Sequence, residues 1–140
     1  MLAISRVYVE KGNKTFVNGD QLFLIAMVAL GGAIGAVLRY CISIILPQSE
    51  PISWCTFAVN FIGCFLICLI FFKYMDMSEA TRVFLFIGIF GAFTTMSSVS
   101  LEMIRDFSDL MPGKAFLVFI MNAIICLGAG FLGRAIVPFI

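Results

Sequence analysis

Five hydroxyl side chains lie within seven residues of one apolar segment and form the densest polar group in it. They are Thr94, Thr95, Ser97, Ser98 and Ser100. Hydroxyls at this density are unfavourable in hydrocarbon unless they bond to partners or line a wet cavity. Gly88 and Gly91 precede them, and glycines combined with hydroxyls weaken a helix. We therefore expect a helix that breaks near its middle and lines a cavity. The alternative is an unbroken helix whose hydroxyls bond to its own backbone.

A broken helix in a membrane has free backbone groups that can bind ions, since carbonyls can coordinate a cation and amides can face an anion. A second apolar segment carries Thr56 and Asn60, four residues apart on one helical face. A carboxamide at membrane depth needs hydrogen-bond partners. From this segment alone, Asn60 is equally compatible with bonding a neighbouring helix and with lining a pore.

Arg39 is the only charged residue in the first apolar segment. Charges within a span are rare and are paired, placed near water, or extended to the headgroups. On the same segment Gly31 and Gly35 are four residues apart, as are Gly32 and Ala36. Small residues at this spacing let two helices approach closely, so we expect helix packing there. Glycines 128, 130 and 133 suggest the same for the last segment.

The elements that must position these residues are four apolar segments, each long enough to span a bilayer, which takes about 20 residues. They run over 22–46, 52–74, 83–103 and 115–137. Hydrophobic residues make up 62% of the 140-residue chain and charged residues 12%, against about 45–50% and about 25% in soluble domains. With a mean hydropathy of +1.12, this composition predicts an all-α integral membrane protein.

Composition also argues against other classes of protein. The net charge of +1 gives no basic field for nucleic acid, and the chain has no histidine and no phosphate-binding glycine loop. The five cysteines follow no metal-binding pattern and are expected to pack as small apolar residues. We expect no enzyme. Residues 1–20 are expected to form a cytosolic tail and 21–140 a four-helix transmembrane domain, with basic residues favouring both termini in the cytoplasm.

Taken together, these features resemble the small bacterial fluoride channels of the Fluc or CrcB family. The family's Gly-x-x-Gly-Ala-x-x-Arg-Tyr pattern stands at 32–40, its Thr-x-x-x-Asn-x-x-Gly pattern at 56–63, and its Gly-x-x-Gly-x-x-Thr-Thr-x-Ser-x-x-Ser pattern at 88–100. The similarity extends over all four segments, roughly residues 22–133. The order and spacing of the three patterns make the resemblance specific.

The resemblance implies an antiparallel, dual-topology dimer in the cell membrane that exports fluoride passively through two narrow pores. It implies a structural sodium ion at the dimer centre, held by the backbone carbonyls of Gly91 and Thr94. Arg39 would lie at the entrance or anchor the fold. The residues along the fluoride path would be Thr56, Asn60, Thr95, Met96, Ser97, Ser98, Val99 and Cys126. Asn60 and the hydroxyls are neutral donors, which suit an ion that must be dehydrated without being trapped.

Two positions in the third segment depart from the family pattern. Met96 and Val99 stand where the family usually has phenylalanines, and neither offers the positive ring edge of that residue. The chain therefore forms either a homodimer with an altered pore wall or a heterodimer with a paralogous subunit.

Two other functions stay open as alternatives. A small four-span multidrug transporter would need an acid deep in its first span, and none occurs between Asp20 and Glu50. A non-transporting membrane assembly subunit would use the same polar residues only to bond its helices together.

Overall fold

The computed structural model describes residues 18–46 and 53–140 and shows four helical spans. The first two spans are single helices, α2 (Gly19–Ile45) and α3 (Trp54–Lys73). The third consists of α4 (Glu79–Arg82), the π-helical η1 (Val83–Ile89), α5 (Phe90–Phe93) and α6 (Met96–Ser108). The fourth consists of α7 (Pro112–Ile120), the π-helical η2 (Met121–Ile125), α8 (Cys126–Ile136) and the 3-10 turn η3 (Val137–Phe139).

Each of the four spans is long and apolar enough to cross a membrane, which confirms the predicted all-α membrane architecture. The helical spans differ from the predicted ones at their ends. The third span begins earlier, at Glu79, and continues to Ser108 rather than ending at 103. The predicted tail lies outside the described residues up to position 17.

Local sequence explains where the later helices begin. The Ser53 side chain accepts the backbone N–H of Thr56 at the start of α3, and Ser78 accepts that of Thr81 at the start of α4. Serine is favoured at this position because its oxygen pairs an otherwise free N–H of the first turn. Pro112 begins α7, where its missing N–H removes no hydrogen bond.

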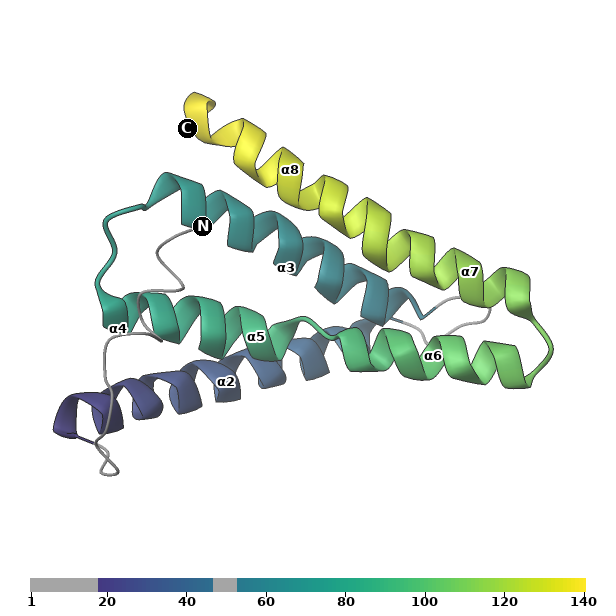
Figure 1. Ribbon diagram of the computed structural model, residues 1–140, viewed down its shortest axis with the longest axis horizontal. Helices are drawn as coiled ribbons and strands as arrows, with labels where there is room; N and C mark the ends of the chain where they lie inside the picture. The colour runs from purple at the N-terminus through teal and green to yellow at the C-terminus, as the bar shows by residue number, and fades with distance from the viewer. Residues whose placement is uncertain (1–17, 47–52) are drawn as a thin grey trace, which may run out of the picture.

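Glycines bring α2 into close contact with the first half of the third span (Figure 1). A Cβ added to Gly88 would lie 2.8 Å from the Cα of Gly31, and one added to Gly35 would lie 3.1 Å from the Cα of Ile89. These distances leave no room for a side chain, so the packing predicted for Gly31 and Gly35 is confirmed. Gly32 has open space around it and takes no part.

The second close helix pair is α3 with α8, which lie side by side in Figure 1. A Cβ on Gly130 would come within 3.1 Å of the Cys68 sulfur, and one on Gly133 within 3.2 Å of the Leu69 nitrogen. The prediction of tight packing is therefore confirmed for these two glycines. It is wrong for Gly128, which faces open space because it lies on another side of α8.

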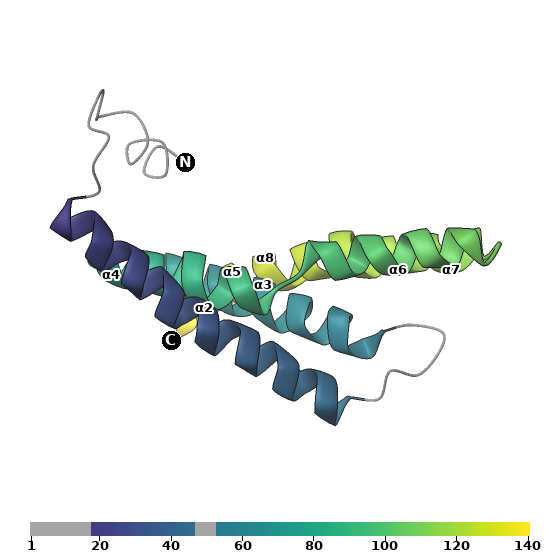
Figure 2. The same cartoon turned by 90° about the horizontal axis from the view of Figure 1, so that it is seen from below.

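The third span is broken near its middle, as the glycine and hydroxyl pattern predicted, and the structure places the break at Thr94 and Thr95. Both residues have extended backbone angles, with φ −78° and ψ 158° at Thr94 and φ −150° and ψ 112° at Thr95. Figure 1 shows the extended connection between α5 and α6. Beyond the break, α6 packs against α7, and Figure 2 shows this pair diverging from the C-terminal half of α2.

Candidate functional site

The broken backbone is held by the side chain of Asn60 from α3. The Thr95 N–H donates to Asn60 Oδ1 over 2.8 Å, and Asn60 Nδ2 donates to the Thr95 carbonyl over 3.1 Å. A buried backbone group without a partner is unfavourable, and here one carboxamide satisfies both groups of one residue. Asn60 and Thr95 are each only 7% exposed, so water does not replace these bonds.

Thr95 also caps the helix that follows the break. Its Oγ1 accepts the backbone N–H of Ser98 over 3.1 Å and donates to the Ser98 hydroxyl over 2.9 Å. The Ser97 hydroxyl lies 3.1 Å from the same oxygen. Three of the predicted site hydroxyls therefore form one connected group at the start of α6.

These bonds leave two backbone carbonyls without their helical donors. In an unbroken helix the Thr95 N–H would bond to the Gly91 carbonyl and the Ser98 N–H to the Thr94 carbonyl. Instead these N–H groups bond to Asn60 and to the Thr95 hydroxyl. The carbonyls of Gly91 and Thr94, which the family resemblance implies as cation ligands, are therefore among those released from the helical pattern at the break. Their role as ligands stays a prediction.

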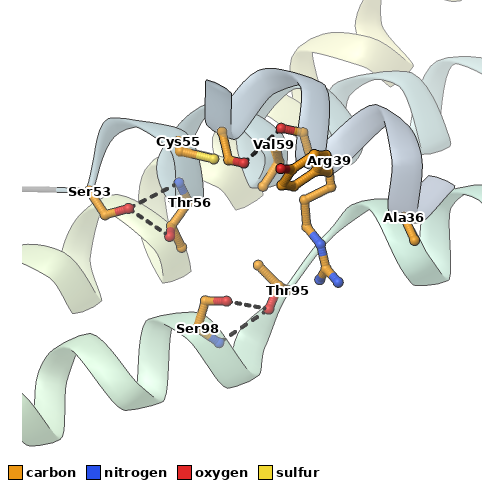
Figure 3. A pocket seen from close by; sticks show the side chains of 10 residues that line it. Ala36, Arg39, Ser53, Cys55, Thr56, Val59, Thr95 and Ser98 are labelled. Carbon is orange, nitrogen blue, oxygen red and sulfur yellow. Dashed lines mark hydrogen bonds between the residues drawn. The ribbon is translucent and has the colours of Figure 1, made fainter. Parts of the chain in front are cut away.

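An open cavity of about 360 Å³ lies between α2, the start of α3 and the break. Its polar lining includes Arg39, Tyr40, Ser53, Thr56, Thr95 and Ser98. Figure 3 shows the Arg39 side chain extending from α2 toward Thr95. The structure therefore brings together four of the predicted residues around a single cavity. They are the arginine side chain of Arg39 and the hydroxyl side chains of Thr56, Thr95 and Ser98.

Glu102 was not among the predicted site residues, although it contacts one of them. The Thr56 hydroxyl donates to Glu102 Oε1 over 2.5 Å. The other carboxylate oxygen, Oε2, is buried and has no hydrogen-bond partner within the described part of the chain. The predicted third segment ended at 103, next to Glu102, but α6 continues to Ser108. Its spacing of four residues from Ser98 was the signal that could have identified it.

The other predicted path residues lie outside the lining of this cavity. Val99 and Cys126 are 0% and 1% exposed, so they are enclosed within the bundle of a single chain. Met96, in contrast, is 61% exposed on the outer face of α6. Because of this, Met96 and Val99 point to different sides of their helix, and only Met96 is available to a neighbouring subunit.

Comparison with known proteins identifies related sequences along most of the chain. The family described as "CrcB-like protein, Camphor Resistance (CrcB)" matches residues 26–134. A protein named "Fluoride-specific ion channel FluC" from Magnetococcus marinus is 35% identical over 117 residues, covering 80% of this chain and 95% of that protein. Proteins of the same name from Idiomarina loihiensis and Methanococcus maripaludis are 38% and 35% identical, covering 84% and 92% of their own lengths.

These relatives are ion channels by name, and the matched region contains all four helical spans in whole or in large part. The expectation that the chain is not an enzyme agrees with them. The four spans and the family match together make this a multi-pass membrane protein and a member of the CrcB family.

Proposed function

We propose that this chain forms a fluoride-selective channel through which fluoride leaves the cytoplasm down its electrochemical gradient, which reduces fluoride toxicity. The observation that carries the proposal is the cavity beside the break of the third span, where one arginine and several neutral hydroxyls surround an open space. The names of the relatives support fluoride as the ion. No acid lies in α2 beyond Asp20, so the chain lacks the carboxylate that a multidrug transporter would need in its first span.

A fluoride ion must lose most of its hydration shell to pass, and donors in the pore must replace that shell without binding the ion too tightly. In the proposed path, Arg39 raises the local anion concentration at the entrance, because it lies in the cavity wall. The hydroxyls of Thr56, Thr95, Ser97 and Ser98 and the Asn60 amide then serve as neutral donors. Val99 and Cys126 line the enclosed part of the path, and Met96 lines the part that faces a second subunit.

The proposed channel is an antiparallel dimer. Gly91, with a carbonyl released from its helix, is exposed in the middle of the third span, and so are Met96 and Ser97. Lipid offers no hydrogen-bond partner for a free carbonyl, whereas a second subunit packed on this face does. Either a second copy or a paralogous subunit can occupy the face, and the paralogue would supply the phenylalanines that Met96 and Val99 replace.

A sodium ion at the dimer centre fits the backbone at the break. Alkali cations bind to carbonyl oxygens of interrupted membrane helices, and the carbonyls of Gly91 and Thr94 have lost their helical donors. We infer that these two carbonyls would hold the ion. Its positive charge would offset the carbonyl dipoles, which otherwise have no partner in the bilayer. We also infer that residues 1–20 form a cytosolic tail preceding the channel domain at 21–140.

The direct test is fluoride efflux from liposomes that contain the purified full-length protein, measured with a fluoride electrode. The protein is expected to release fluoride much faster than chloride, either alone or together with a paralogous subunit. If neither preparation releases fluoride faster than chloride, the proposed function is wrong. Replacing sodium with a large organic cation during purification is expected to reduce the dimeric fraction, as measured by light scattering in detergent.

A further inference from the structure

The Asn60 carboxamide uses both of its hydrogens within the protein. Asparagine has two N–H donors, and Asn60 directs one to the Thr95 carbonyl and the other to Oδ1 of Asn122, over 3.1 Å and 2.9 Å. The orientation of the amide is fixed, because the Thr95 N–H needs an acceptor and so must face Asn60 Oδ1. In this arrangement Asn60 has no hydrogen left to donate to an anion.

Asn122, in η2 of the fourth span, is oriented by a contact of its own. Its Nδ2 donates to the Val118 carbonyl over 3.0 Å, four residues earlier on the same span. With the nitrogen held there, the amide oxygen is the atom that faces α3 and Asn60. A fixed chain of bonds therefore runs from the Val118 carbonyl through two carboxamides to the backbone break.

We propose that Asn122 is a positioning residue that sequesters one N–H of Asn60, so that an anion reaches this donor only by displacing the Asn122 amide oxygen. The inference rests on the proposed function, because it concerns how the fluoride path obtains its donors. The Asn122 oxygen also supports the orientation that the Thr95 N–H sets, because it accepts a hydrogen bond from the Asn60 nitrogen.

In this exchange a hydrogen bond from Asn60 to fluoride replaces the hydrogen bond from Asn60 to Asn122, and the two bonds can compete. Hydrogen bonds between neutral groups contribute less than bonds to an ionised partner, so a dehydrated fluoride can compete with a neutral amide oxygen. The Thr95 carbonyl keeps its own bond to Asn60 during the exchange, so the break remains closed. A competing acceptor lowers the net affinity for the ion, which is what conduction requires, since an ion that binds too tightly does not leave.

The first test compares Asn122→Ala with wild type as full-length protein in liposomes. Deleting the acceptor frees one Asn60 N–H, so the apparent fluoride affinity is expected to rise roughly two- to tenfold, the range for one neutral hydrogen bond. Ser108→Ala is a matched control, because Ser108 also bonds to its own helix backbone but lies exposed at the end of α6. It is expected to leave fluoride affinity unchanged.

The second readout does not depend on transport. In protein labelled with ¹⁵N at asparagine, the side-chain amide signal of Asn60 is expected to shift in Asn122→Ala even without fluoride. An unchanged Asn60 signal overturns the proposal, even if the wild type conducts fluoride. A wild type that neither binds nor releases fluoride overturns the proposed function instead, and the amide shift still decides whether Asn122 positions Asn60.

Asn122→Asp keeps the test decisive if the alanine variant does not fold. The carboxylate has the same shape and is a stronger acceptor toward Asn60, although it loses the donor to the Val118 carbonyl. The apparent fluoride affinity is expected to fall by at least the factor by which alanine would raise it. A fluoride affinity equal to or higher than that of the wild type in this variant contradicts the proposal.

Discussion

Replacing Asn60 with leucine removes the side chain that closes the backbone break while keeping the same number of heavy atoms and the same branching. The substitution deletes three hydrogen bonds of 2.8, 3.1 and 2.9 Å. It also leaves the N–H and carbonyl of Thr95, a residue only 7% exposed, without those partners. A neutral hydrogen bond contributes about 0.5–1.5 kcal/mol and an unpaired buried group costs about 1–3 kcal/mol. Side-chain bonds within membranes average about 0.6 kcal/mol. We therefore expect the free energy of unfolding to fall by about 3–5 kcal/mol.

The assay is equilibrium unfolding of the full-length protein in mixed detergent micelles, followed by circular dichroism, together with hydrogen exchange at the Thr95 amide. Exchange at Thr95 is expected to accelerate in Asn60→Leu, because its N–H loses the Asn60 acceptor. Asn60→Asp should be intermediate, since it keeps the acceptor for Thr95 but loses both donors. Ser108→Ala, which removes an exposed hydroxyl, is the control. Unchanged stability and unchanged Thr95 exchange in Asn60→Leu would refute this account of the break.

Three further predictions concern the contacts around the break. Gly88→Ala should lower the free energy of unfolding by about 1–3 kcal/mol, because the added methyl group meets the backbone of α2. Gly32→Ala adds its methyl group in open space and should leave the free energy of unfolding unchanged, and chemical unfolding measures both variants. Glu102→Gln should raise fluoride flux in the liposome assay, because the amide can still accept from Thr56 but no longer places a negative charge beside the cavity; unchanged or reduced flux would contradict this. Arg39→Gln should lower fluoride flux mainly at low ionic strength, since salt screens charges beyond about 8 Å at physiological concentration; a loss that is independent of salt would argue against attraction of anions.

The sequence was sufficient to predict the features that depend on composition and spacing. Apolar segment length predicted all four spans, and the glycine and hydroxyl pattern predicted a break near the middle of the third, which lies at Thr94 and Thr95. The four-residue spacing of Gly31 and Gly35 predicted a close helix contact, because residues at this spacing share a face whatever their partner is. Such periodic signals lie within one segment and need no knowledge of the neighbouring helix.

The hydrogen-bond partner of each polar side chain could not be predicted from the sequence. Asn60 bonds Thr95, 35 positions away, and Asn122, 62 positions away, and no spacing within a segment encodes such pairs. Glu102 was missed because its helix is longer than hydropathy suggested, which places the carboxylate inside the span. The π-helical segments in the third and fourth spans were also not predicted, since a single extra residue in a helical turn changes hydropathy very little.

The contacts around the cavity change how the donors along the proposed fluoride path are understood. The hydrogens of Thr56 and Asn60, which the family resemblance assigned to the ion, are bonded to acceptors within the protein, namely Glu102, Asn122 and the Thr95 carbonyl. A pore with free donors would bind a dehydrated anion tightly and release it slowly. A pore whose donors are already satisfied binds the ion only by exchanging one acceptor for another, so the net gain at each step is small. In the proposed channel, the same bonds that stabilise the break would therefore also limit how strongly the path holds fluoride.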